Sequence, residues 1–535
     1  MGLTKVDSDG VEDNPSFSGT GGMKIPVGNT SQRVDTTGLV RFNSQTGLLE
    51  YYDGTTYKGL DTPPVVSSVN TSNFESSALP TNVVITGSNF ASSVSVKFIG
   101  ADGTETASGS VTRDSVTQVT AQIPNTITSD NEPYKIQVTN TTSALSGTLA
   151  NAFNIDAAPA FGVASGSLGT LGSYGAASGL TTITATDDEG DSITFSVSSG
   201  SVPGGLTLNS NGTWSGNANA VTSSTTTTFT VQASDGTNTS TRQYSITVNP
   251  VFVQLSGSGT WTVPSGVLAA EILIVAGGAS GSRSPNVSGG GGGGGGIVHR
   301  SSYTFTATDK SSGIAYVVGA GGNGVGISPE AYDGGYNNGA DSTFALSGGT
   351  ITAKGGGGGA GYGGNTHKPG FGSSYYAPSQ GGSGGGGAWE SGTGASSNQA
   401  DFTGWTSYGN SGGNRASGEN YAGAGGGGAG GAGSNSTATV GGNGGAGQLF
   451  SSFTSYGASG YFGGGGAGGS QSDTVPQGGS GGGGNGGYGS GATNRSGANA
   501  TDGTGGGGGG SRNLGYGTFT YKSGDGGNGT ILIKY

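Results

Sequence analysis

Hydrophobic and polar residues alternate along short stretches of this chain, and a period of two is typical of β-strands with one buried face. Asn82–Thr86 and Val94–Ile99 show this pattern, and Gly, Asn and Asp residues that favour turns interrupt it. Stretches with the 3.6-residue period of an amphipathic helix are almost absent. The pattern therefore predicts an all-β protein, and a length of 535 residues allows three or four domains.

The C-terminal half departs from this pattern because its glycines form uninterrupted runs, such as Gly289–Gly296, Gly355–Gly359 and Gly505–Gly510. The chain contains 121 Gly, and a residue without a side chain contributes nothing to an apolar core. A flexible linker is the simplest interpretation of such runs. However, strand-like sequences bracket the region at Glu271–Ala276 and Thr530–Tyr535. We therefore expect the first and last strands to pair and to clamp an ordered region.

The glycine runs do not fit collagen, which requires Gly at every third position and abundant Pro, whereas this chain has only 16 Pro. They suit polyproline-II helices, which have three residues per turn and no internal hydrogen bonds, so that the backbone polar groups point outward. Because Gly has no Cβ, neighbouring helices can approach until their backbones bond to one another. We predict a polyglycine-II bundle clamped by β-strands, with the aromatic islands between the runs displayed as loops at its ends.

The borders of this region carry a resemblance to a known family. Trp261–Val267, Ala270–Gly278 and the ending Gly526–Tyr535 resemble the opening and closing strands of glycine-rich domains in phage tail-fibre and adhesin proteins. The resemblance implies polyglycine-II layers whose variable loops contact a bacterial receptor. It does not extend residue by residue into the low-complexity interior.

Residues 1–61 are expected to form a small N-terminal module. Gly38–Lys58 reads as small hairpins and resembles a short repeat unit of phage structural and fibre proteins. A unit of this size is too small to bury a core alone, which predicts that it packs against copies of itself or against a virion partner.

Two immunoglobulin-like sandwiches are expected to follow. Residues 62–156 resemble an IPT/TIG domain through Val84–Phe90 and other strands, and such domains are usually spacers. Residues 157–250 resemble a cadherin-like putative immunoglobulin domain through Ala185–Phe195 and later strands. Residues 251–535 would then form the glycine-rich tip domain.

Four acidic residues of the second sandwich are candidate Ca²⁺ ligands, because Ca²⁺ prefers carboxylate oxygens. They are Asp187, Asp188, Glu189 and Asp191. The alternative is a solvated turn rich in Asp and Gly. We favour the turn, because a complete site between domains needs further ligands from a neighbouring domain that the sequence does not identify.

Aromatic residues in the islands are the candidate receptor contacts, because their rings supply rigid contact area beside the polar Ser, Asn and Gly. The candidates are Tyr332, Tyr336, Phe371, Tyr375, Tyr376, Trp389, Phe402, Trp405, Tyr408, Phe453, Tyr456 and Tyr461. The alternative for each ring is local packing over the ends of the polyglycine layers.

Composition narrows the classes of function. A net charge of −12 disfavours nucleic acid as a partner, since such binding depends on Lys and Arg. Without cysteine there are no disulfides and no thiolate metal sites. The longest apolar run, Val267–Ala276, is too short to span a membrane and contains Glu271, and no signal peptide is evident. His299 and His367 lie far apart and no carboxylate pair stands out, so we predict no catalytic residue and no enzyme.

Together these features predict a phage tail-fibre protein of the virion. The N-terminus would attach to other virion proteins, and the glycine-rich domain would bind a host-surface glycan or outer-membrane protein. No cofactor is expected beyond the Ca²⁺ candidate, and analogy with other fibres predicts a homotrimer. The alternatives are a purely structural decoration of the head, neck or tail, and a bacterial surface adhesin.

Overall fold

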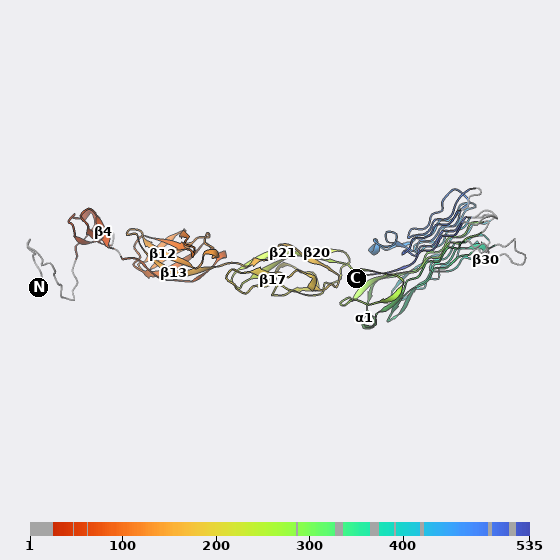
Figure 1. The fold of residues 1–535 in the computed structure, drawn as a ribbon, viewed down its shortest axis with the longest axis horizontal. Helices are drawn as coiled ribbons and strands as arrows, with labels where there is room; N and C mark the ends of the chain where they lie inside the picture. Colours follow the sequence, from red (N-terminus) through yellow and green to blue (C-terminus); the bar gives the residue numbers. More distant parts are fainter. Residues whose placement is uncertain are drawn as a thin grey trace, which may run out of the picture.

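The computed structural model arranges the chain as four regions in a row, from a small N-terminal sheet to the glycine-rich domain (Figure 1). It describes residues 25–45, 48–60, 62–284, 287–326, 335–363, 374–389, 392–417, 422–490, 495–512 and 521–535. Among these residues the only α-helix is α1 (Ala307–Ser312), so the fold is all-β as predicted. No helix in the described part of the chain is both long and apolar enough to cross a membrane.

The N-terminal module is a four-stranded sheet in the order β1-β2-β3-β4. Its elements are β1 (Val27–Gly28), the 3-10 turn η1 (Thr30–Gln32), β2 (Val40–Asn43), β3 (Leu48–Tyr52) and β4 (Tyr57–Leu60). The pair β1–β2 is parallel, whereas β2, β3 and β4 form antiparallel hairpins. The hairpins expected within Gly38–Lys58 are therefore present.

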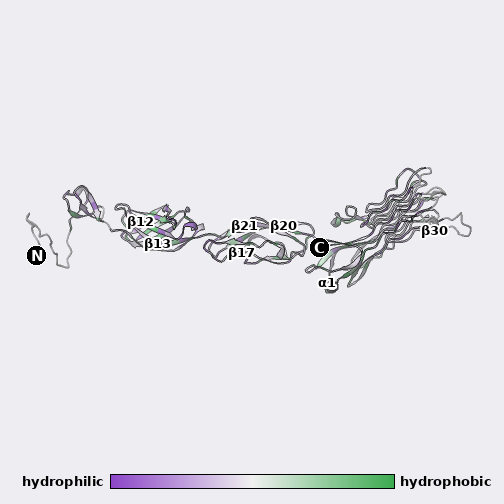
Figure 2. Cartoon of the chain, viewed as in Figure 1, coloured by the Kyte–Doolittle hydropathy of each residue, from purple (hydrophilic) through white to green (hydrophobic). Residues whose placement is uncertain are grey.

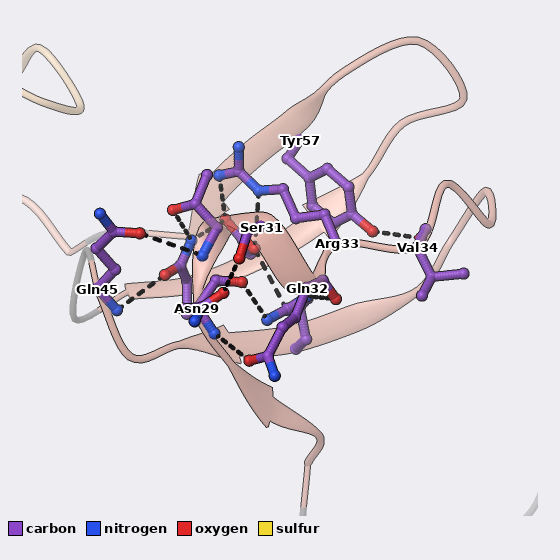
Figure 3. A network of polar contacts seen from close by, with 11 residues as sticks. Asn29, Ser31, Gln32, Arg33, Val34, Gln45 and Tyr57 are labelled. Carbon is purple, nitrogen blue, oxygen red and sulfur yellow. Dashed lines mark hydrogen bonds and ion pairs between the residues drawn. The ribbon is translucent and has the colours of Figure 1, made fainter.

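The interior of this module is polar. Arg41, Asn43 and Glu50 are 4%, 0% and 2% exposed. Glu50 Oε2 lies 2.6 Å from Arg33 Nη2 and accepts a hydrogen bond from Asn43 Nδ2 at 3.1 Å. The hydrogen bond from Arg33 is the main cause that holds the pKa of Glu50 below its usual value. Figure 3 shows the network of polar contacts around Asn29, Gln32 and Arg33, and polar contacts of this kind organise the module in place of an apolar core.

The first immunoglobulin-like domain is a sandwich of a four-stranded and a five-stranded sheet, in the orders β10-β11-β7-β5 and β6-β13-β12-β8-β9. Its elements are β5 (Val65–Val69), β6 (Asn73–Glu75), η2 (Ser76–Ala78), β7 (Thr81–Ser88), β8 (Val94–Ile99), β9 (Glu105–Ala107), β10 (Val111–Ser115), β11 (Gln118–Ile123), η3 (Ser129–Asn131), β12 (Tyr134–Asn140) and β13 (Leu145–Asp156). Alternate residues of these strands point inward, and Phe98 and Phe153 meet edge to face with ring centres 5.7 Å apart. This domain is held by apolar burial.

The second immunoglobulin-like domain has one main sheet in the order β15-β21-β20-β17 and two short antiparallel pairs, β14–β16 and β18–β19. Its elements are β14 (Ala160–Phe161), β15 (Gly166–Gly172), η4 (Ala177–Gly179), β16 (Ala185–Thr186), β17 (Thr194–Gly200), β18 (Leu206–Leu208), β19 (Trp214–Gly216), β20 (Thr225–Ser234) and β21 (Thr239–Asn249). Phe229, Tyr244 and Ile246 are buried in its core. Asn238 joins the two sandwiches, because its amide donates to the carbonyl oxygen of Asp156 and its Oδ1 lies 3.0 Å from Ser77 Oγ.

The glycine-rich domain begins with two sheets, in the orders β22-β34-β24-β25-β31 and β23-β26-β27-β28. Their strands are β22 (Phe252–Leu255), β23 (Ser258–Trp261), β24 (Ala269–Val275), β25 (Ile297–Thr304), β26 (Ile314–Val317), β27 (Ser342–Leu346), β28 (Gly349–Ala353), β31 (Thr406–Tyr408) and β34 (Thr530–Lys534). Shorter elements are β29 (Gly361–Gly363), β30 (Ser374–Tyr376), β32 (Gln448–Leu449), η5 (Ser451–Phe453) and β33 (Tyr461–Phe462). The last strand, β34, pairs with both β22 and β24, with Lys534 opposite Phe252 and Glu271. The predicted clamp between the first and last strands is confirmed.

Beyond these sheets the chain forms parallel and antiparallel extended segments that we call the glycine lattice. Its segments are 276–284, 287–296, 318–326, 335–341, 354–360, 378–389, 392–398, 409–417, 422–436, 440–447, 462–471, 476–489, 495–501, 504–512 and 521–529. The segment Gly289–Gly296 runs through it, and every third N–H donates to the same neighbour. The N–H groups of Gly289, Gly292 and Gly295 donate to the carbonyl oxygens of Ser511, Gly508 and Gly505 in one neighbouring segment. Those of Gly290, Gly293 and Gly296 donate to Ala360, Gly357 and Lys354 in a second segment. Those of Gly291 and Gly294 donate to Ala424 and Gly427 in a third.

The carbonyl oxygens of the same segment repeat this period of three. They accept from Ser282, Ala279 and Ala276, from Gly469 and Gly466, and from Gly386 and Ser383. Three donor directions and three acceptor directions give the segment six neighbours, as expected for a helix with three residues per turn and outward-pointing polar groups. Glycine is required because an added Cβ would enter a neighbouring backbone: at Gly292 it would lie 2.4 Å from the carbonyl oxygen of Ala279. The lattice is thus a polyglycine-II bundle held by backbone hydrogen bonds.

The lattice has two different ends. At the proximal end it continues into β24, β25 and β34, where Figure 2 shows green, hydrophobic strands next to the pale ribbon of the lattice. At the distal end, far from the immunoglobulin-like domains, lies β30 (Figure 1). There the backbone N–H of Arg283 donates to the carbonyl oxygen of Gly335, and the backbones of Arg495 and Arg512 are hydrogen-bonded to each other. The chain between residues 284 and 287, 326 and 335, 363 and 374, 389 and 392, 417 and 422, 490 and 495, and 512 and 521 lies outside the described residues.

Candidate functional site: the distal end of the glycine lattice

The outermost segments of the lattice replace missing backbone acceptors with side chains. Asn338 Oδ1 accepts from the N–H of Gly358 at 2.9 Å, and Asp341 Oδ1, three residues later, accepts from the N–H of Gly355 at 2.8 Å. Asn499 and Asp502 repeat this spacing and accept from the N–H groups of Asp525 and Asn528 at 3.0 Å. Because one turn has three residues, polar side chains at this spacing line one face and close the lattice sideways. These four side chains therefore supply acceptors for backbone N–H groups at the sides of the lattice.

At the distal end, Arg415 and Trp389 form a pair. The Arg415 guanidinium carbon lies 5.4 Å from the Trp389 ring centre, and its Nη1 donates to the carbonyl oxygen of Trp389 at 2.7 Å. Trp389 has a φ of +38°, a conformation that is uncommon for a bulky residue. The lattice holds this strained residue where segment 378–389 ends, and both side chains are only partly buried. Strain of this kind is concentrated at sites that bind ligands.

A second cation–ring pair lies at the same end. The Arg495 guanidinium carbon is 4.7 Å from the ring centre of Tyr488, and Arg495 is exposed. The backbones of Arg495 and Arg512 exchange two hydrogen bonds, at 3.1 and 2.9 Å. The neighbouring carboxylate of Asp473 accepts from Ser490 Oγ and N–H, which are the main causes of its lowered pKa, with the charges of Arg512 and Arg495 adding to them.

Two more arginines are buried where the lattice ends. Arg283 and Arg512 are 4% and 1% exposed, and this burial lowers the pKa of both guanidinium groups. Together with Arg415 and Arg495 they place four cations at the distal end of a chain whose net charge is −12. The distal end therefore brings aromatic rings and guanidinium groups together.

The predicted aromatic contacts divide between the two ends. Tyr332 and Phe371 lie outside the described residues, and so does the side chain of Tyr375, whose backbone belongs to β30. Tyr336, Tyr376 and Trp389 are described, partly buried, and lie toward the distal end. The ring of Tyr336 lies against Gly358, where an added Cβ would overlap it. Receptor contact by Tyr336, Tyr376 and Trp389 stays a prediction.

The remaining six candidates lie at the proximal end. Phe402 and Trp405 pack against the apolar cluster of the two sheets, and Tyr408 and Tyr456 pack against a second cluster that contains Leu273 and Leu532. Tyr461 lies in β33, partly buried, beside that second cluster. Phe453 is 1% exposed and belongs to it, so its side chain cannot touch a receptor in this conformation. The alternative of local packing over an end of the lattice therefore describes these proximal rings, because the apolar strands there provide a core for them. Receptor contact by the five partly buried rings stays a prediction.

The structure also reveals residues that the search for aromatic islands missed. Tyr488, Arg415 and Arg495 were not candidates, because Tyr488 is flanked by Gly and the arginines are isolated in sequence. The available signal was that segments 378–389, 409–417, 476–489, 495–501 and 504–512 each carry an Arg or a large ring within a few residues of their distal ends.

The acidic candidates for Ca²⁺ lie at the junction of the two sandwiches. Asp187 Oδ1 accepts from the N–H groups of Glu189 and Asp191. These are the hydrogen bonds expected of a turn rich in Asp and Gly, the alternative to a Ca²⁺ site. Asp156 lies nearby, and burial, with the charge of Asp235 as the next cause, raises its pKa. Among the described residues no group of three or more His, Cys, Asp or Glu side chains is arranged to hold a metal ion. The Ca²⁺ ligand role therefore stays a prediction.

Comparisons with known proteins agree with the domain content. Residues 64–153 match the model of the IPT/TIG domain, and residues 170–249 match the model of the putative Ig domain. Residues 253–535, more than half of the chain, match the model of the glycine-rich domain. None of these three descriptions names an enzyme. A search of curated proteins finds no match.

Several solved structures are similar to parts of this chain, at low identity and low TM-score. The insect immune protein hemolin is 14% identical over 37% of this chain and 49% of its own, with a TM-score of 0.21. Domains 3–5 of Drosophila OTK are 13% identical over 38% of this chain and 72% of theirs, with a TM-score of 0.20. Domains EC1–3 of the mouse clustered protocadherin PcdhgC3 are 15% identical over 38% of this chain and 74% of theirs, with a TM-score of 0.22. This chain thus spans about half the length of the hemolin structure.

These structural matches carry no information on function, whereas the family model covers both sheets and the whole lattice. The chain belongs to the glycine-rich domain family, and an IPT/TIG domain and a putative Ig domain precede its glycine-rich region.

Proposed function

We propose that this chain is a fibre protein that binds a bacterial cell surface through the distal end of its glycine lattice. One observation carries the proposal. The distal end, on the side of the glycine-rich domain away from the immunoglobulin-like domains (Figure 1), carries the cation–ring pairs Arg415–Trp389 and Arg495–Tyr488. Aromatic and Arg side chains are the residue types that dominate binding surfaces.

The bonding of the lattice supports this function. Backbone groups supply the hydrogen bonds around Gly289–Gly296, so we expect side chains at the distal end to contribute little to holding the segments together. Substitutions there can change the binding surface without changing the lattice. A surface that must follow a variable receptor benefits from this separation of roles.

The other regions fit a fibre. Two sandwiches in a row would hold the glycine-rich domain away from the point of attachment (Figure 1). The N-terminal module exposes Val27 and Val34 at 65% and 61%, and the attachment that we propose for it is to another protein of a virus particle. The resemblance of the glycine-rich region to phage tail-fibre domains supports a virion as the place of attachment.

Binding of the fluorescently labelled full chain to a panel of bacteria tests the proposal. In the test variant, Trp389→Asn, Tyr488→Ser and Arg495→Ser are combined. Asn is chosen for position 389 because it tolerates a positive φ. We expect the variant to lose binding to every strain that the wild-type chain binds, with an unchanged melting temperature.

The matched control is Phe252→Ser at the proximal end, where the Lys534 ammonium lies 5.7 Å from the ring centre and Phe252 is 38% exposed. This control should keep cell binding. If the distal variant binds as well as the wild-type chain, or if both variants lose binding equally, the distal end is not the contact surface.

Association with a virus particle is tested separately by mass spectrometry of purified particles from cells that produce the protein. Detection at a constant ratio to the other particle proteins supports the virion assignment. Recovery only from bacterial surfaces contradicts it and favours a bacterial adhesin.

A further inference from the structure

A pocket of about 300 Å³ opens beside the proximal sheets, away from the distal end. Its lining includes the half-buried side chains of Arg300, Tyr303, Phe402 and Trp405, and the hydroxyl-bearing residues Thr350 and Thr403. This volume is at the lower end of the range for small-molecule sites, and a mixture of aromatic walls with a few polar groups is typical of such sites. The pocket thus suits a ligand about the size of one sugar ring.

Arg300 is held at this pocket by backbone on two sides. A bulge in the pairing of β24 with β25 falls between the partners of Ile272 and Ala270, immediately after Arg300, and bulges re-aim side chains. Arg300 Nε donates to the carbonyl oxygen of Ser302 at 3.1 Å. Gly404, with a φ of +78°, lets the loop backbone approach the guanidinium, because an added Cβ would lie only 2.9 Å from Nη1. The guanidinium is therefore positioned before any ligand arrives.

Two aromatic rings flank this guanidinium. Its central carbon lies 5.4 Å from the ring centre of Tyr303 and 5.9 Å from that of Trp405, within the range of cation–π contacts. The two rings are 6.0 Å apart at an angle of 35°. Tyr303 is fixed because its hydroxyl donates to Asp309 Oδ2 at 3.0 Å, and burial with this contact raises the pKa of Tyr303 to about 12. The wall of the pocket is therefore rigid.

The charge of Arg300 has no acidic partner in the described part of the chain. No ion pair joins Arg300 to a described carboxylate, and no described residue accepts a hydrogen bond from its Nη1 or Nη2. Among the residues that the structure describes, no acidic side chain lines the pocket. The buried carboxylate beside Tyr303, that of Asp309, already accepts from Tyr303, Thr306 and the N–H of Ser347. Two parallel donors therefore stand in a partly buried site beside aromatic rings, the geometry that binds a carboxylate through two hydrogen bonds.

We propose that this pocket binds a carboxylate-bearing pyranose, such as a uronic acid unit of an acidic polysaccharide. The carboxylate would take the two terminal nitrogens of Arg300, and the C–H face of the sugar ring would lie against Trp405. Thr350 and Thr403 supply hydroxyl groups for the sugar hydroxyls. This binding site is separate from the distal surface and goes beyond the proposed function.

Titration of the full chain with methyl β-D-glucuronide, followed by calorimetry and ligand-observed NMR, tests this assignment. Methyl β-D-glucoside has the same ring without the charge, and acetate has the charge without the ring. We expect the glucuronide to bind at least about tenfold more tightly than either, since both groups of contacts are then made. We expect Arg300→Gln to abolish binding and Arg300→Lys to weaken it, because Lys supplies a charge without the planar fork.

Thermal melting of each variant shows whether it folds. If Arg300→Gln does not fold, Arg300→Lys is the test variant, because it keeps the charge and the aliphatic stem. Equal binding of acetate and glucuronide would reduce the pocket to a simple anion site and overturn the proposal. Glucuronide binding that is unchanged in Arg300→Gln, or absent in the wild-type chain, would do the same. The variant combining Trp389→Asn, Tyr488→Ser and Arg495→Ser should keep glucuronide binding, so this proposal and the distal contact surface can fail independently.

Discussion

The immunoglobulin-like domains and the glycine lattice both have a buried interior, but opposite kinds of interaction stabilise it. In the first sandwich, Val96, Phe98 and Ile136 are fully or almost fully buried, and stability comes from apolar surface removed from water. In the lattice, the buried residues around Gly289–Gly296 are mostly glycines, and the interior is made of backbone hydrogen bonds. The comparison teaches that a large buried volume does not require a hydrophobic core, provided that every backbone polar group finds a partner.

The two interiors should respond oppositely to the size of a side chain. A sandwich core fails when a side chain is removed, because a cavity is left. The lattice fails when a side chain is added, because neighbouring backbones lie where the Cβ would be. The following changes test this contrast, from the largest expected effect to the smallest.

Phe98→Ala should destabilise the first sandwich by about 4 kcal/mol, because it removes a fully buried ring that contacts Phe153. Differential scanning calorimetry of the full chain should show one transition moving to lower temperature while the others stay in place. A loss that spreads to all transitions would show that the regions unfold as one unit.

Gly292→Ala should destabilise the lattice by about 3 kcal/mol, the upper part of the usual range for overpacking. The new Cβ would lie 2.4 and 2.5 Å from the carbonyl oxygens of Ala279 and Ser280. The matched control is Gly326→Ala, since no atom lies within 4 Å of a Cβ built there. Equal melting temperatures for the two variants would contradict the close packing of the lattice.

Asn338→Ala should destabilise the lattice by about 1 kcal/mol, because the N–H of Gly358 loses its acceptor at the side of the lattice. Asn338→Asp keeps an oxygen at the same place and should melt close to the wild-type chain. If Asn338→Ala has no effect in calorimetry, water replaces the side-chain acceptor and the spacing of three has no energetic role.

Asp156→Asn should have the smallest effect, and this effect should depend on pH. Burial and the charge of Asp235 raise the pKa of Asp156 in the folded protein, so the folded state binds the proton more tightly than the unfolded state. The contribution of Asp156 to stability is therefore full below its unfolded pKa and is lost as pH rises through its folded pKa. The variant should gain stability over the wild-type chain at pH 7 and little at pH 3, as measured by urea unfolding at both values. A gain of the same size at both pH values would show that the charge is not the cause.

Several parts of the architecture could be predicted because they depend on local chemistry. Alternation in Val94–Ile99 predicts a strand, and the β-branched ending Thr530–Lys534 predicts the clamp that forms with β24. The glycine runs predict polyglycine-II because no other regular structure needs residues without Cβ on every face. These inferences use only the conformational preferences of each segment.

The candidate sites could be predicted less well, because they depend on which segments become neighbours. Trp405 and Trp389 lie in similar glycine-rich surroundings in sequence, yet one packs near the proximal sheets and the other lies at the distal end. Arg300 and Gly404 are about a hundred residues apart, and nothing in either segment indicates that they meet.

The sequence by itself determined the all-β class, the clamped ends and the lattice, since a missing side chain acts directly on its own backbone. Only the tertiary structure decided which rings lie at the distal end, which join the proximal core, and where Arg300 meets Trp405. The physical reason is that one glycine run has nearly the same sequence as another. The sequence of a run therefore determines how it packs, but the register between distant segments determines which side chains meet at the surface. That register comes from many backbone hydrogen bonds acting together, and no single segment encodes it.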